Sequence, residues 1–215
     1  MSQTEEFEPE AVRIAEQLRA AIIDGTRAAG SKLVERDIAT ELGVSRLPVR
    51  EALKTLVSEG LVTQRPRSWA VVREFTATDI ADLIEVRSGL ELMTFKLAAQ
   101  RYTRQGLEEL REVLDSELEH AQRGDMLTAR REAARFHDLI NSMSGNVLLY
   151  ELHQNLSARM RWLMTQHDDV LGMAHEHTAL YEAIAARDVA ALEVLVPKHL
   201  ETSRSSATER TADTQ

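Results

Sequence analysis

Two arginines, Arg46 and Arg50, stand four residues apart in the most basic stretch of the chain. Residues 45–73 hold six Lys or Arg and two Asp or Glu, although the whole chain carries a formal net charge of -9. Residues four apart share one face of a helix, and the planar guanidinium can donate two hydrogen bonds to guanine O6 and N7. With Ser45 at the start of that helix, the pattern predicts a face that binds DNA.

Histidines form the second group that could do chemistry. All seven lie in the later part of the chain, at positions 120, 137, 153, 167, 175, 177 and 199. A single histidine on a helix is most often a surface or core residue. Three of them have contexts that favour a role beyond packing: His137 follows Phe136, His177 precedes an apolar helical stripe, and His199 lies on the last expected helix.

Composition limits the class of protein. The chain has 215 residues, of which 43% are hydrophobic, 28% charged and 4% aromatic. This balance indicates a folded, mainly helical protein. The absence of cysteine excludes disulfides, a thiol nucleophile and cysteine-type zinc sites. We expect a cytoplasmic protein without a membrane span, because no apolar run is long enough and the acidic first residues do not resemble a signal peptide.

The first third of the chain predicts a winged helix-turn-helix over residues 8–73. Apolar spacing favours a helix that starts near Pro9 and ends at Gly25, followed by a loop at 26–32. Helices at 35–42 and 45–59 flank the turn at Gly43, which is the helix-turn-helix pattern. Two short strands at 61–64 and 69–72 form a small β-hairpin, and its turn places Arg65 and Arg67 at the tip.

A linker at 74–77 leads to a second domain at 78–204, which we expect to be an all-α bundle of six helices. The helices are expected to end near residues 101, 123, 143, 166, 186 and 203. Residues 205–215 are polar and are expected to form a flexible tail. The predicted fold class is therefore mainly α.

The first domain resembles the winged helix-turn-helix of the GntR family of bacterial transcription regulators. The matching stretches are IIDG at 22–25, GSKLVERDIA at 30–39, LGVSRLPVREAL at 42–53 and EGLV at 59–62, with Leu56 between the last two. The resemblance implies that Arg36, Ser45, Arg46 and Arg50 contact DNA and that the hairpin, with Arg65 and Arg67, enters the minor groove. Two positions depart from the family pattern: Leu47 replaces a common Thr, and the wing lacks a Gly near Ser68.

The second domain resembles the ligand-binding FCD domain of the FadR subfamily, in its shorter, VanR-like branch. The resemblance implies one divalent metal, Zn²⁺ or Ni²⁺, held by His137, His177 and His199. The family's Asp ligand falls at Ala133, so that anionic ligand is missing, and Glu132 points about 100° away around the helix. Without a metal, the three histidines would form a polar floor that binds an anion directly.

Arg87 matches an arginine that lines the family's effector cavity. A guanidinium facing a cavity can bind a carboxylate through two hydrogen bonds. The alternative is a surface ion pair with Glu91, which lies four residues later on the same expected helix.

The combined prediction is a transcription regulator that binds a palindromic DNA operator as a homodimer and senses a small carboxylate. The resemblance implies that it acts as a repressor. Two other readings remain open. One is a hydrolase that uses a three-histidine metal, and the other is an architectural DNA-binding protein that responds to no effector.

Overall fold

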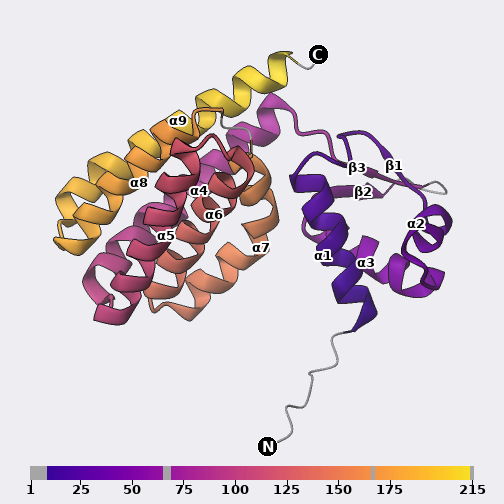
Figure 1. The fold of residues 1–215 in the computed structure, drawn as a ribbon, viewed down its shortest axis with the longest axis horizontal. Coiled ribbons are helices and arrows are strands. Elements are labelled where there is room, and N and C mark those ends of the chain that lie inside the picture. Colours follow the sequence, from indigo (N-terminus) through magenta and orange to yellow (C-terminus); the bar gives the residue numbers. More distant parts are fainter. Residues whose placement is uncertain (1–8, 65–68, 166–167, 214–215) are drawn as a thin grey trace, which may run out of the picture. The chain divides into compact units, whose positions relative to one another are not determined.

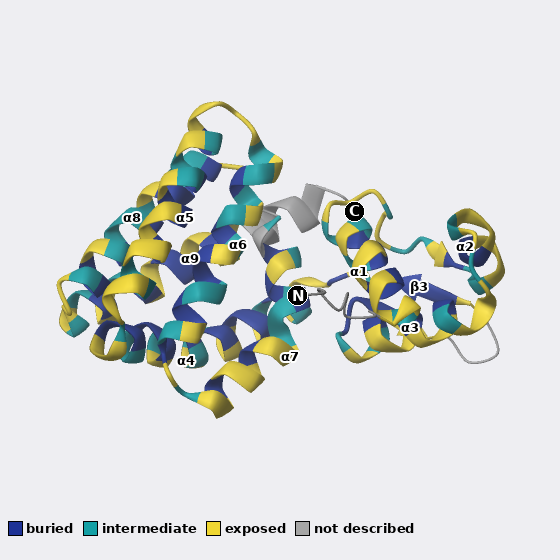
Figure 2. Ribbon diagram, turned by 60° about the horizontal axis from the view of Figure 1, so that its bottom comes forward, coloured by how far each residue is buried: buried dark blue, intermediate teal, exposed yellow. Residues whose placement is uncertain are grey.

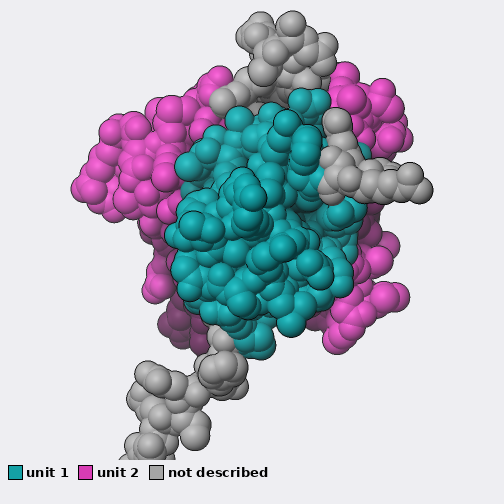
Figure 3. Space-filling model, turned by 90° about the vertical axis from the view of Figure 1, so that its right-hand side faces the viewer, with its two compact units in different colours: residues 1–74 teal, residues 75–215 magenta. Residues whose placement is uncertain are grey.

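The computed structural model describes residues 9–64, 69–165 and 168–213. The chain divides into two units, residues 1–74 and 75–215, and the expected linker spans this division (Figure 3). Helices dominate both units (Figure 1). No helix in the described segments is long and apolar enough to cross a membrane.

The first unit combines three helices with a small antiparallel sheet. Its elements are α1 (Glu10–Ile23), β1 (Lys32–Leu33), α2 (Glu35–Leu42), α3 (Arg46–Ser58), β2 (Val62–Gln64) and β3 (Ala70–Val72). The strand order is β1-β3-β2. Strand β1 differs from the prediction, which was a loop at 26–32 with no strand there. It pairs with β3, with Lys32 opposite Val71, and a two-residue strand is too short to produce a periodic signal.

The core of this unit follows from apolar stripes on α1 and α3. Ile14, Leu18 and Ile22 of α1 are buried at helical spacing, and Val49 and Leu56 of α3 are fully buried. The two helices pack against each other. Gly43 has φ +66°, a conformation that glycine adopts without strain, and it reverses the chain between α2 and α3. The opposite face of α3 is therefore left to solvent.

The second unit is a bundle of helices, as expected (Figure 1). They are α4 (Ala77–Arg101), α5 (Arg104–Gln122), α6 (Met126–Met143), α7 (Val147–Met164), α8 (Val170–Ala185) and α9 (Val189–Asp213). At the starts of α4 to α8, a side chain accepts a backbone hydrogen bond and fixes where the helix begins. These capping residues are Thr76, Thr103, Asp125, Asn146 and Asp169.

Helix α9 continues to Asp213, so the expectation of a helix end near Ser203 is wrong. No glycine or proline follows Pro197 in the sequence, and nothing local therefore interrupts the backbone hydrogen bonds. Helix occupies most of the segment at 205–215 where a tail was expected.

The bundle helices carry many buried residues, which Figure 2 colours dark blue on the ribbon. Phe95, Leu114, Phe136, Ile184 and Val196 are members of the main cluster, which draws on α4, α5, α6, α8 and α9. Several polar side chains, including Arg87 and His177, are also fully buried within this unit. Polar groups are costly to bury without partners, so their arrangement marks the place to look for function.

We expect Leu56→Ala to lower the free energy of unfolding of the first unit by about 2–5 kcal/mol, because Leu56 is fully buried and truncation leaves a cavity. Urea unfolding in a Trp162→Phe background measures this, since Trp69 then reports on the first unit. The matched control is Leu47→Ala on the same helix, where Leu47 is 64% exposed. A similar loss in both variants would contradict the burial of Leu56 in the core of the first unit.

Candidate DNA-binding surface and histidine cluster

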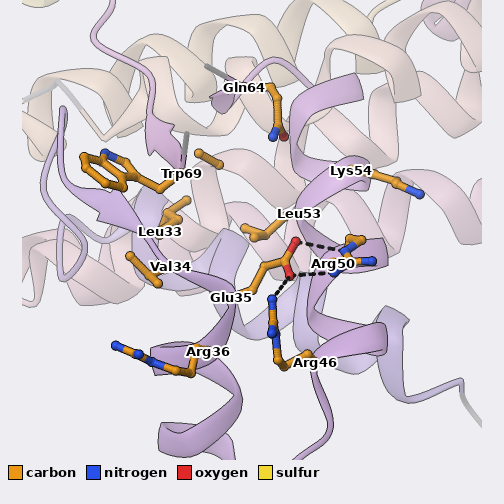
Figure 4. A pocket seen from close by; sticks show the side chains of 11 residues that line it. Leu33, Val34, Glu35, Arg36, Arg46, Arg50, Leu53, Lys54, Gln64 and Trp69 are labelled. Atoms are coloured by element: carbon orange, nitrogen blue, oxygen red, sulfur yellow. Dashed lines mark hydrogen bonds and ion pairs between the residues drawn. The ribbon is translucent and has the colours of Figure 1, made fainter. Parts of the chain in front are cut away.

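Arg46 and Arg50 lie side by side at the exposed start of α3, as the sequence predicts. Both point toward Glu35 of α2 (Figure 4). Arg50 donates from Nε and Nη2 to the two Glu35 oxygens, each at 3.0 Å, and Arg46 Nη2 lies 3.3 Å from Oε2. The hydrogen bond from Arg50 holds the pKa of Glu35 below its ordinary value, so Glu35 stays ionised. One carboxylate therefore orients both guanidinium groups.

A groove of about 860 Å³ runs between α3 and the small sheet. Besides the two arginines, its lining includes Arg36, Lys54 and Gln64, and Trp69 closes one side (Figure 4). Lys32 Nζ lies 4.2 Å from the Trp69 ring centroid, which adds a further cation near this wall. The groove is thus bordered by basic and hydrogen-bonding side chains, as a surface that binds phosphates requires.

Ser45 and Arg36 extend the same basic surface. Ser45 occupies the N-cap position of α3, and its side chain makes no capping hydrogen bond within the described chain. The hydroxyl is therefore available to a phosphate at the helix N-terminus. The Arg36 side chain is 79% exposed and forms an ion pair with the neighbouring Asp37. Arg65 and Arg67, the expected contacts of the wing tip, lie outside the described residues.

His137 of α6, His177 of α8 and His199 of α9 come together in the second unit, although 62 positions separate the first from the last. One ring nitrogen from each lies within 4.8 Å of the others, and all three residues are buried. The Nε2 atoms of His137 and His177 are 3.2 Å apart. Two nitrogens bound tetrahedrally to Zn²⁺ would be about 3.3 Å apart. The spacing of this pair is therefore suited to a shared metal ion.

Each histidine has a carboxylate beside its other ring nitrogen. His177 Nδ1 lies 2.9 Å from both oxygens of Glu117, His199 Nδ1 lies 2.8 Å from Glu176, and His137 Nδ1 lies 3.4 Å from Glu91. A carboxylate that accepts Nδ1–H fixes the ring and makes Nε2 a better donor to a metal. The cluster thus presents the arrangement that surrounds histidine-bound metals.

Arg87 is buried completely beside this cluster. Its Nε donates to Glu91 at 2.6 Å, and its Nη2 lies 3.5 Å from His137 Nε2. The ion pair with Glu91 that the sequence left as an alternative is present, but it is buried and not on the surface. Burial, and next the Arg87 cation, hold the pKa of His137 well below its ordinary value. His137 is therefore neutral at neutral pH, which is the form that binds metals.

Ala133 lies one turn before His137 on α6 and is buried, so no carboxylate enters from that position. Glu132, its neighbour, is 3.6 Å from Arg135. The prediction from sequence did not include the carboxylates that contact the histidines, which are Glu91, Glu117 and Glu176. Glu117 could have been found, because it continues the apolar stripe of Leu110, Val113 and Leu114 on α5, where an acid needs a buried partner.

Comparison with known proteins agrees with both units. The family model "Bacterial regulatory proteins, gntR family" matches residues 10–72, and the model "FCD domain" matches residues 82–202. The chain belongs to the GntR family. It is 32% identical to the Nta operon transcriptional regulator of Aminobacter aminovorans over 191 residues, which cover 84% of this chain and 90% of the relative.

Two further relatives extend the likeness of this GntR-family chain. A probable D-xylose utilization operon transcriptional repressor of Paenarthrobacter nicotinovorans is 26% identical over 194 residues, covering 87% of this chain and 85% of that protein. The solved structure of E. coli McbR/YncC shares the fold, with a TM-score of 0.83 and 23% identity over 95% of this chain and 99% of that one. The GntR-family chain is a DNA-binding transcription regulator with an FCD domain, and its relatives are regulators and not enzymes. This finding sets the hydrolase interpretation aside.

We expect Arg50→Ala to weaken binding to a DNA site selected from random duplexes by about 1–3 kcal/mol, because a base-reading guanidinium is lost. Fluorescence anisotropy at fixed salt measures the change. Arg104→Ala is the control, since Arg104 is 92% exposed at the start of α5 and pairs only locally with Glu108. Equal affinities for Arg50→Ala and the control would remove α3 from the DNA contact.

Proposed function

We propose that this protein is a repressor that binds a palindromic operator as a homodimer and is regulated by a small carboxylate bound at a metal in its FCD domain. The observation that supports the effector site best is the buried cluster of three histidines with Arg87 against it. Burying polar side chains costs free energy of folding. A purely architectural DNA-binding protein would not need such a cluster.

The residues present suit a divalent metal even without a carboxylate at Ala133. Glu91, Glu117 and Glu176 lie beside the histidines, and within the described residues the Arg87 guanidinium is the cation that contacts this group. Three carboxylates against one guanidinium leave two formal negative charges to balance, which a divalent cation would do. His137, His177 and His199 would hold Zn²⁺ or Ni²⁺, and the metal would supply an open position for an anion.

Arg87 supports a carboxylate as the effector. Its Nη1 is buried and has no hydrogen-bond partner among the described residues. An unused N–H of a buried guanidinium is a strong donor to an anion. One carboxylate oxygen would complete the metal shell and the other would accept from Arg87.

Exposed apolar side chains support a homodimer. On α4, Val86 and Met93 are both 52% exposed and lie seven residues apart, with half-buried Leu90 between them on the same face. On α7, Val147 and Leu148 are 75% and 66% exposed. Helices α4 and α7 contact each other, so the two sets belong to neighbouring elements. A second copy of the chain would remove them from water and give two recognition helices for a palindrome.

Regulation follows if the effector favours one arrangement of the paired winged units. Binding of a ligand shifts an equilibrium only by its difference in affinity for the two states. The FCD domain would therefore release or tighten the operator by changing how often the two α3 helices match adjacent half-sites. Assignment to the FadR subfamily and its VanR-like branch is consistent with this scheme.

For the metal, we expect about one Zn or Ni per chain in untagged protein purified without chelator, measured by elemental mass spectrometry. His177→Ala should lose the metal, because His177 lies within bonding reach of the same point as His137. His175→Ala is the matched control, since His175 is exposed two residues earlier on α8. Protein that stays free of metal after supplementation would mean that the histidines bind the anion directly.

For the regulator, we expect a selected operator to be palindromic and to bind two chains per duplex in analytical ultracentrifugation. The right carboxylate should change operator affinity by about 5- to 150-fold, measured by fluorescence anisotropy against a panel of small carboxylates. Their uncharged methyl esters are the control and should have no effect. An operator affinity that no metabolite changes would favour an architectural DNA-binding protein.

A further inference from the structure

Leu47 is an exposed apolar side chain at the start of α3. It is the second residue of this helix and is 64% exposed, whereas Val49, two residues later, is fully buried. Val49 therefore packs into the first unit, and Leu47 faces solvent. A single exposed leucine is ordinary on a protein surface, so the side chains around Leu47 decide what it can contact.

The neighbours of Leu47 on this face of the helix are cations. Arg50 and Lys54 follow three and seven residues later and are also exposed, so the three side chains form one row along α3. Arg46 directly precedes Leu47, and Glu35 holds both arginines. Phosphates and base edges are the groups that such a row of cations attracts. Leu47 therefore lies within the face of α3 that meets DNA.

The chemistry of leucine limits what it can recognise in the major groove. Its side chain neither donates nor accepts a hydrogen bond, so it does not read the polar edges of the bases. The 5-methyl group of thymine is the methyl group that the four bases present in this groove. Contact between leucine and this group removes apolar surface of both from water. A polar base edge in the same place would lose its hydrogen bonds to water, which is unfavourable.

The position of Leu47 along the helix places such a thymine near the base that Arg50 contacts. N-terminal residues of a helix in the major groove contact base edges, and Leu47 is the second residue of α3. Side chains three positions apart on a helix are about 5–6 Å apart. Successive bases of one strand are roughly 3.4 Å apart along the duplex. The separation of Leu47 and Arg50 therefore corresponds to one or two base pairs.

We propose that Leu47 is a specificity-determining residue that contacts the 5-methyl group of a thymine, one or two base pairs from the base that Arg50 contacts. This inference rests on the binding of DNA by α3. It adds a preference that the arginines do not supply, because guanidinium groups select guanine or bind phosphates.

Deoxyuridine tests the proposal, because it pairs as thymidine does and lacks only the 5-methyl group. A DNA site is first selected from random duplexes with the full-length protein. Each thymine of the selected site is then replaced singly by deoxyuridine, and fluorescence anisotropy at fixed salt gives the Kd of each duplex. We expect at least one thymine whose replacement weakens binding about fourfold, which is the effect of leaving one methyl group unburied.

Leu47→Ala should reduce the thymine preference at that position to less than about twofold, because alanine is too short to reach the methyl group. The change in the protein and the change in the DNA form a double-mutant cycle, which separates the contact from effects of uracil on DNA shape. Leu47→Gln is a second variant, which keeps the length of the side chain, replaces its apolar end with an amide and should also abolish the preference.

Leu127→Ala is the matched control. Leu127 is likewise the second residue of a helix, α6, and is 44% exposed, but it lies in the second unit. This variant should keep the wild-type preference for thymine. Urea unfolding of each variant checks that the first unit is as stable as in the wild-type protein.

Two results overturn the inference alone while Arg50→Ala still weakens binding. One is a selected site in which no deoxyuridine replacement changes the Kd, and the other is a thymine preference that survives both Leu47 variants. Failure of Arg50→Ala to weaken binding is a different outcome, because it removes α3 from the DNA contact and the inference with it.

Discussion

The fold of the second unit depends on how its buried carboxylates are paired with donors and cations. Glu117 is 1% exposed and reaches His177, which is fully buried, across 60 positions of sequence. Removing a carboxylate from water is unfavourable unless donors and opposite charge surround it. For Glu117 the His177 imidazole provides the donor, and in our proposal a divalent cation held by the histidines adds the opposite charge. The helices of the bundle must pack so that these groups meet, and this requirement places the histidine cluster in the core.

A second carboxylate, Glu35, orients the arginines of the candidate DNA-binding surface, but its ion pairs are exposed to solvent and not buried. Glu35 is only partly buried, and it orients Arg46 and Arg50 while the arginines stay 63% and 48% exposed. Exposed ion pairs are weak, so a phosphate or a base can take over these guanidinium groups at little cost. The same residue pair, an acid with an arginine, is therefore fixed where it is buried and exchangeable where it meets solvent.

Distribution of charge explains how an acidic protein binds DNA. The formal net charge of -9 belongs to the chain as a whole, whereas residues 45–73 are basic. Interactions between exposed charges fade over roughly 10 Å at moderate salt. The cations that border the groove beside α3 therefore set the local potential there, whatever the net charge of the whole chain.

The sequence by itself determined the features that depend on local spacing. Helical periodicity, caps such as Thr103 and the turn at Gly43 fixed the helix-turn-helix, the order of the bundle helices and the face of α3 that carries Arg46 and Arg50. Only the tertiary structure decided the rest. Strand β1 exists because β3 offers it an edge, and α9 continues to Asp213. Arg87 proved to be buried, and Glu91, Glu117 and Glu176 became partners of the histidines. Those contacts join residues that are mostly far apart in sequence, and local periodicity carries no information on which distant helix faces meet.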